Sequence, residues 1–182
     1  MLPSKAAILY PQKLTCKELD TFSDGLAVGL TDLGVKKGNT VALFMWNSPE
    51  FIIAFFGALK AGATVTALNP SFKEKNAQYQ LEDSESMIVI VDDEQYPVIA
   101  NIRNKVSRLK NVIVVGEKKY PDTYLFSEIV EKYPPNPPKV KIDPKEDLAV
   151  LQYTAGTTGL PKGCMLSHYN ITSNIFQISI GA

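Results

Sequence analysis

Apolar residues along the chain occur in short runs that alternate with segments of helical periodicity. The runs predict buried strands, and the segments between them predict amphipathic helices. Strands are expected at Thr40 to Trp46, Thr64 to Leu68, Met87 to Val91 and Leu148 to Tyr153. Strands that alternate with helices at this spacing indicate βαβ units and a largely parallel sheet covered on both faces. The expected fold class is therefore α/β, a βαβ-type layered sheet with flanking helices.

Local signals predict where the first helices begin and end. Thr15 to Glu18 fits a capping box, and Gly34 stands where a left-handed C-cap residue is expected. The apolar face between them consists of Leu19, Phe22, Leu26, Leu30 and Leu33. Ser48 and Pro49 fit the cap and first position of a second helix that ends near Gly62.

Two further segments complete the predicted elements of this region. Glu74 to Asp83 is expected to form a helix. At the amino terminus, Ala6 to Tyr10 and the turn Pro11-Gln12-Lys13 predict a small hairpin.

The composition changes between Gly116 and Asp147, where six of the twelve prolines and many charges flank one amphipathic segment, Leu125 to Tyr133. Pro134 to Pro138 cannot continue a helix and is expected to be an extended surface connector. We therefore divide the chain into a βαβ region (1–115), a Pro-rich connector (116–147) and a carboxy-terminal part (148–182).

The string from Tyr153 to Gly163 is rich in groups that bind phosphate, with three glycines, three threonines and one lysine in eleven residues. Glycines let backbone amides approach an anion, hydroxyls add neutral donors, and the ammonium group adds charge. It is not a Walker loop, because Lys162 is followed by Gly163 and not by a hydroxyl residue, and no G-x-G-x-x-G occurs. A Gly/Thr-rich hairpin turn without a ligand is the alternative interpretation.

The residues after this string predict a second strand and then a helix. Cys164 to Leu166 is short and apolar, and Ser167 fits the cap of a helix, so the string is expected to lie between two strands. His168 is the only histidine, but it lies five residues beyond the string, and a catalytic role is not favoured. One face of the last helix is apolar and has no predicted partner: Ile171, Ile175 and Ile178.

The same string resembles the signature loop of the adenylate-forming superfamily, which includes acyl-CoA synthetases, aryl-CoA ligases, luciferases and peptide-synthetase adenylation domains. It matches everywhere except Ala155, where the family usually has serine or glycine. Trp46 also departs from the family, since many relatives have proline there. Four segments resemble the opening of acyl-CoA ligases: Leu14 to Leu19, Leu33 to Gly38, Asn47 to Phe51 and Gly57 to Ala63.

This resemblance implies an incomplete amino-terminal part of the large adenylate-forming domain. The complete enzyme would use ATP and Mg²⁺ to activate a small-molecule carboxylic acid, fatty or aryl, as an acyl-adenylate and transfer it to coenzyme A. The family's adenine, ribose and carboxy-terminal lysine motifs do not occur in residues 1–182, so this piece alone is expected to be inactive and to lack the coenzyme A site. A non-catalytic nucleotide-binding or interaction remnant of such an enzyme is the alternative.

The resemblance also implies roles for individual residues. Lys162 would stabilise the charge of the departing pyrophosphate, and Thr154 would lie on the Mg²⁺ side. The residues implied to bind the ATP phosphates are Thr154, Ala155, Gly156, Thr157, Thr158, Gly159, Leu160, Pro161 and Lys162.

Charge and cysteine content narrow the remaining function classes. Lysine plus arginine equal aspartate plus glutamate at 19 each, so no net charge favours nucleic acid. Two cysteines, Cys16 and Cys164, form neither a disulfide framework nor a metal cluster. The longest apolar run, Phe51 to Leu59, is too short to cross a membrane. We expect a soluble, cytoplasmic protein, and the sequence predicts no oligomeric state.

Overall fold

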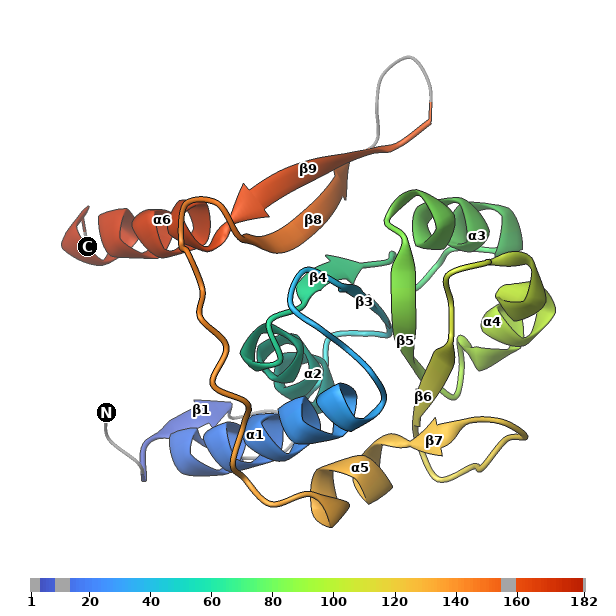
Figure 1. Cartoon of the computed structure of the whole chain (residues 1–182), viewed down its shortest axis with the longest axis horizontal. Helices are drawn as coiled ribbons and strands as arrows, with labels where there is room; N and C mark the ends of the chain where they lie inside the picture. The colour runs from blue at the N-terminus through green and yellow to red at the C-terminus, as the bar shows by residue number, and fades with distance from the viewer. Residues whose placement is uncertain (1–3, 9–13, 155–159, 182) are drawn as a thin grey trace.

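A seven-stranded sheet forms the centre of the computed structural model, which describes residues 4–8, 14–154 and 160–181 (Figure 1). The strand order is β7-β6-β5-β3-β4-β8-β9, and every neighbouring pair is parallel except β8 and β9. The strands are β3 (Thr40–Phe44), β4 (Thr64–Ala67), β5 (Ser86–Asp92), β6 (Asn111–Val115), β7 (Tyr124–Leu125), β8 (Leu148–Thr154) and β9 (Lys162–Ser167). The predicted α/β class is confirmed.

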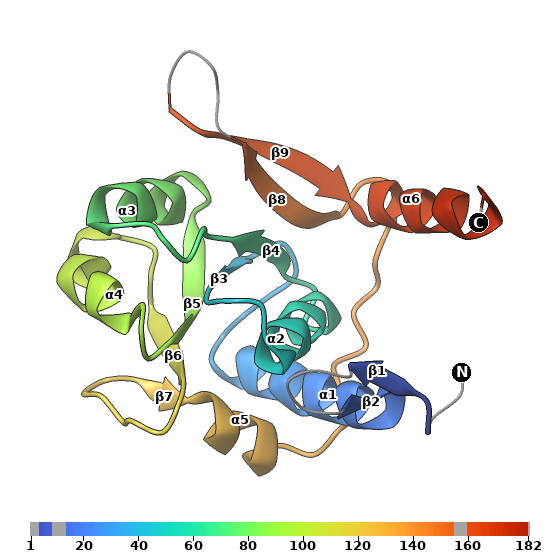
Figure 2. The same cartoon turned by 180° about the vertical axis from the view of Figure 1, so that it is seen from behind.

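Helices cover both faces of this sheet. They are α1 (Cys16–Asp32), α2 (Pro49–Lys60), α3 (Glu74–Asp83), α4 (Tyr96–Ile102), α5 (Phe126–Lys132) and α6 (His168–Gly181), and a 3₁₀ turn, η1 (Arg103–Lys105), follows α4. One core cluster joins α1, α2 and α5 to the sheet, and a second joins α3 and α4 to the opposite face. Figure 2 shows the same two layers from behind, with the β8–β9 hairpin and α6 beyond the β4 side of the sheet.

The caps that the sequence predicts are present. The Glu18 amide donates to Thr15 Oγ1 at 3.2 Å, and the Thr15 amide donates to Glu18 Oε2 at 2.8 Å. At α2, the Phe51 amide donates to Ser48 Oγ at 3.1 Å. Gly34 ends α1 with φ of +91°, the left-handed conformation that glycine adopts without strain.

The amino-terminal hairpin is confirmed in its paired part. Strand β1 (Ala6–Ile8) pairs antiparallel with β2 (Leu14–Thr15). The predicted turn, Pro11-Gln12-Lys13, lies outside the described residues.

Several described elements are not predicted by the sequence patterns above: α4, the turn η1, β6 and β7. Part of the expected connector, residues 116–147, also belongs to the packed structure. Strand β7 pairs with β6, and Phe126 and Ile129 of α5 are buried in the core cluster of α1 and α2. The amphipathic segment Leu125 to Tyr133 thus forms α5 because its apolar face is buried against α1.

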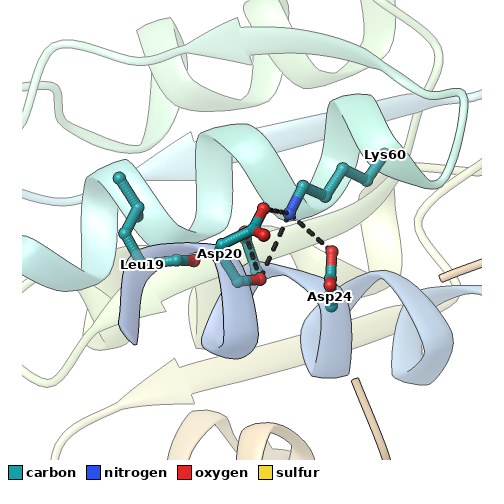
Figure 3. A network of polar contacts seen from close by, with 5 residues as sticks. Leu19, Asp20, Asp24 and Lys60 are labelled. Atoms are coloured by element: carbon teal, nitrogen blue, oxygen red, sulfur yellow. Dashed lines mark hydrogen bonds and ion pairs between the residues drawn. The ribbon is translucent and has the colours of Figure 1, made fainter. Parts of the chain in front are cut away.

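Helices α1 and α2 are joined by a polar network as well as by apolar packing (Figure 3). Lys60 Nζ of α2 lies 2.6 Å from Asp20 Oδ1 and 2.5 Å from Asp24 Oδ1 of α1, and also donates to the Asp20 carbonyl oxygen. Because Asp24 is mostly buried, this lysine offsets the cost of desolvating its carboxylate.

Candidate functional site

The two described ends of the phosphate-binding string face each other across the β8–β9 hairpin. Thr154 pairs with Lys162 and Tyr153 pairs with Gly163 in an antiparallel register. The prediction that the string lies between two strands is confirmed. The predicted phosphate-binding residues Ala155, Gly156, Thr157, Thr158 and Gly159 lie outside the described residues.

A cleft of about 530 Å³ lies beside the hairpin, where β4 and β8 end. Ligands of open α/β sheets bind outside the carboxyl ends of the strands, so this is the edge at which a ligand is expected. The lining includes Leu68, Asn69, Phe72, Gln152, Thr154 and Pro161. A smaller hollow of about 250 Å³ lies between α3 and Leu160–Pro161.

Thr154 lines this cleft, and both Thr154 and its partner across the hairpin, Lys162, are exposed. Within residues 4–8, 14–154 and 160–181, no carboxylate forms an ion pair with Lys162. A residue with a hydroxyl group and a residue with an ammonium group are therefore paired at the end of the hairpin. A donor set of this kind suits the oxygens of a polyphosphate.

Tyr153 makes two contacts that shape the hairpin. A Cβ atom on Gly163 would lie 3.2 Å from Cε2 and Cζ of the Tyr153 ring, so the glycine leaves room for the ring to cross the neighbouring strand. The Tyr153 hydroxyl donates to Asp83 Oδ2 of α3. Burial, and then this hydrogen bond to a carboxylate, raise the pKa of Tyr153 well above its ordinary value of 10. The phenol therefore stays protonated to a higher pH than an ordinary tyrosine does.

Side chains attach β8 to the rest of the sheet. The β4–β8 ladder has a single registered pair, Val65 with Val150. Thr66 Oγ1 donates to the Leu151 carbonyl at 3.0 Å, and Thr64 Oγ1 donates to the Leu148 carbonyl at 3.3 Å. These hydroxyls supplement a backbone ladder that is short at this point.

The remaining candidates lie away from the string. His168 begins α6 at the opposite end of β9 from Lys162, and a six-residue strand is about 20 Å long at roughly 3.3 Å per residue. Ser167 caps α6 as predicted, since the Asn170 amide donates to Ser167 Oγ at 3.3 Å. His168 therefore has a place at a helix start, remote from the cleft.

No group of three or more histidine, cysteine or acidic residues in the described part of the chain is arranged to hold a metal ion. The role of Thr154 on the Mg²⁺ side thus stays a prediction. Cys16 and Cys164 are both free thiols. Among the described helices, none combines the length and apolar character needed to cross a membrane.

Three residues of α3 that the sequence patterns do not identify contact the hairpin or its neighbouring strand. They are Tyr79, Gln80 and Asp83. Tyr79 and Asp83 are four residues apart and share one helix face, which is visible in the sequence. Their partners are 82 and 70 residues away, so no local pattern identifies what that face contacts.

A family model described as AMP-binding enzyme matches residues 1–182. The long-chain-fatty-acid–CoA ligase of Bacillus subtilis is 32% identical over 197 residues, covering 94% of this chain and 35% of that protein. The 4-coumarate–CoA ligase CCL1 of Humulus lupulus is 33% identical, covering 90% of this chain and 30% of its own length. The chain thus spans about a third of the length of these relatives.

Solved structures agree with these matches. A crystal structure of an anthranilate CoA ligase in complex with anthranoyl-AMP is similar with a TM-score of 0.89 at 29% identity, covering 96% of this chain and 34% of that one. A long-chain-fatty-acid–CoA ligase from Archaeoglobus fulgidus has a TM-score of 0.85 at 30% identity over the same shares.

Proposed function

This chain belongs to the AMP-binding enzyme family, and from that premise we propose that it forms the amino-terminal portion of an ATP-dependent acid–thiol ligase. The enzyme joins a carboxylate to the α-phosphate of ATP with release of pyrophosphate, and then passes the acyl group to the thiol of coenzyme A with release of AMP. The observation that carries the proposal is the pairing of Thr154 with Lys162 at a cleft on the carboxyl edge of the sheet.

The chemistry of adenylation explains why such a loop is useful. A carboxylate is a weak nucleophile, so the reaction depends on positioning and on stabilising the charge that develops on the leaving pyrophosphate. The ammonium group of Lys162 supplies roughly 4 kcal/mol of attraction to one phosphate charge at 4 Å and an effective dielectric of 20, before desolvation is subtracted. Residues Thr154 to Lys162 bind the ATP phosphates in this proposal, with Thr154 on the Mg²⁺ side.

The proposed substrate is a medium or long aliphatic, or an aryl, carboxylic acid. It is supported by the relatives, which are named as ligases of long-chain fatty acids and of 4-coumarate. We place the enzyme in the cytoplasm, and the free thiols of Cys16 and Cys164 fit a reducing compartment.

The experiment measures the two half-reactions separately in the complete enzyme. Lys162→Ala should lower kcat of ATP–pyrophosphate exchange on the order of 10²-fold, with little change in KM for the acid. Thr157→Val and Thr158→Val should act in the same direction but less, because each removes a neutral donor. Thioester formation from supplied acyl-adenylate should survive all three changes, since no triphosphate takes part in that step.

The matched control is Lys118→Ala, which removes an exposed lysine remote from the hairpin and should leave both half-reactions unchanged. Equal losses in both half-reactions of Lys162→Ala, or no loss in either, would contradict the proposed role of the loop. Exchange driven only by amino acids would contradict the proposed substrate class.

A further inference from the structure

Helix α3 lies beside the loop end of the β8–β9 hairpin, as both whole-chain views show (Figures 1 and 2). Tyr79 and Asp83 occupy successive turns of one helix face. That face contacts the hairpin on both arms of the phosphate-binding string.

Each arm is attached through one hydrogen bond. On the arm that leads into β9, Tyr79 Oη donates to the carbonyl of Pro161, the residue directly before Lys162, at 2.9 Å. On the β8 arm, the hydroxyl of Tyr153, the residue directly before Thr154, donates to Asp83 Oδ2. The two contacts therefore flank the Thr154–Lys162 pair.

A third side chain fixes α3 to the sheet itself. Gln80 is buried, and its Nε2 donates to Thr66 Oγ1 at 2.9 Å and to the Ala67 carbonyl at 3.1 Å. Thr66 in turn donates to the Leu151 carbonyl of β8 at 3.0 Å. These hydrogen bonds fix the position of α3 relative to β4 and β8. Tyr79 and Asp83 on the same helix can therefore hold the hairpin in a defined position.

The contacts with α3 matter for the hairpin because few strand pairings connect it to the rest of the sheet. Among the described strands β9 pairs only with β8, and β8 joins β4 through one registered pair. An isolated two-stranded hairpin is marginally stable in water. In catalysis, a misplacement of about 1 Å can cost on the order of 10²-fold in rate.

We propose that Tyr79 and Asp83 are positioning residues that hold the two arms of the phosphate loop against α3, so that Lys162 and Thr154 meet the triphosphate of MgATP. The inference rests on the proposed function of the loop. It predicts an effect on the use of MgATP and none on recognition of the acid.

The test uses Tyr79→Phe and Tyr153→Phe in the complete enzyme, because each change removes one hydroxyl and keeps the ring. Hydrogen–deuterium exchange of amides in β8 and β9 should become about threefold to tenfold faster in Tyr79→Phe, the range expected from one lost neutral hydrogen bond, and at least as much faster in Tyr153→Phe, which loses a hydrogen bond to a carboxylate. KM for MgATP in pyrophosphate exchange should rise by a similar factor, while KM for the acid stays unchanged.

Two further variants separate positioning from general damage. Asp83→Asn keeps an acceptor oxygen and should remain within about twofold of the parent protein, whereas Asp83→Ala should match Tyr153→Phe. Tyr133→Phe is the matched control, because it breaks another tyrosine–aspartate hydrogen bond, to Asp32 of α1, away from the hairpin. It should change neither the exchange of β8 and β9 nor KM for MgATP.

The inference is overturned if Tyr79→Phe and Tyr153→Phe behave like Tyr133→Phe, or if Asp83→Asn is as damaging as Asp83→Ala. These results are separate from those that decide the function. If Lys162→Ala leaves pyrophosphate exchange intact, the proposed function fails, and hydrogen exchange still decides whether α3 holds the hairpin.

Discussion

Thr66 illustrates how one side chain can join three elements. Its hydroxyl accepts from Gln80 of α3 and donates to the Leu151 carbonyl of β8, and the residue is fully buried. A buried donor or acceptor that loses its partner costs more free energy than the hydrogen bond itself contributes. Loss of this hydroxyl should therefore cost more free energy of unfolding than its two hydrogen bonds contribute.

Replacing Thr66 with valine keeps the shape and β-branching but removes both hydrogen bonds. We expect Thr66→Val to lower the free energy of unfolding by about 1–3 kcal/mol, because Gln80 and the Leu151 carbonyl each lose a partner. Urea denaturation of the two proteins measures this difference in the free energy of unfolding. Thr31→Val is the control, since that exposed hydroxyl only donates to the Ala27 carbonyl of its own helix, and its change should stay within about 0.5 kcal/mol.

Residue-level prediction from sequence succeeds where partners are close along the chain. The caps at Thr15 and Ser48 follow from residues three positions away. The contacts of Tyr79 with Pro161 and of Tyr153 with Asp83 have no such signal, because the fold alone brings these residues together. The phosphate-binding character of the string could therefore be predicted from the sequence, whereas its contacts with α3 could not.

At the scale of elements, the longer periodic helices and most apolar runs were predicted, whereas α4 and β6 were missed for different reasons. Helix α4 has seven residues with Pro97 in its first turn, too short to show an apolar stripe. Strand β6, Asn111–Val115, has four consecutive apolar β-branched residues, a signal that could have identified it. The periodicity of apolar residues does not predict which elements pack closely together, and the close contact of α1 with α5 is an example.

Gly25 of α1 makes that contact possible, and Gly25→Ala tests it. An added Cβ would lie 2.9 Å from the Val130 carbonyl oxygen and 3.1 Å from the Tyr133 carbonyl oxygen, both backbone atoms that cannot rotate away. We expect a loss of about 1–3 kcal/mol in the free energy of unfolding, which outweighs the roughly 1 kcal/mol gained from better helix propensity.

Thermal and urea unfolding measure this change. The control, Thr21→Ala on the exposed face of the same helix, should be neutral or slightly stabilising. A Gly25→Ala protein as stable as Thr21→Ala would show that α5 moves aside at no cost.

For the whole molecule, the alternation of strands and helices was enough to predict a parallel sheet, but not the order of its strands. β3 lies between β4 and β5, and β8 joins the sheet on the far side of β4 although the segment 116–147 intervenes in sequence. The strand order depends on how the helices and the sheet pack together as whole layers, which no local sequence pattern shows. It leaves α6 at one end, with apolar side chains on its surface.

The exposed apolar face of α6 predicts that residues 1–182 expressed alone self-associate or are loosely packed. Ile175, Phe176 and Ile178 are 61–64% exposed, and contiguous apolar patches promote association. Sedimentation velocity at several concentrations should show species larger than a monomer, and Ile175→Ser with Ile178→Ser should reduce them. Gln177→Ser, a polar change on the same helix, should have no effect. A monomer that unfolds cooperatively at every concentration would disprove this.

The position of β8 beside β4 also has a consequence for the order of events during synthesis. Strands β3 to β7 and helices α1 to α5 all lie within the first 132 residues, so they can pair before β8 leaves the ribosome. In that interval β4 has an open edge, which is a template for pairing with the wrong chain. Thr64 and Thr66 place hydroxyls there that water can solvate, and the same hydroxyls later donate to β8. The β4 edge is thus open during synthesis until β8 pairs with it, and the same two side chains then help to close it.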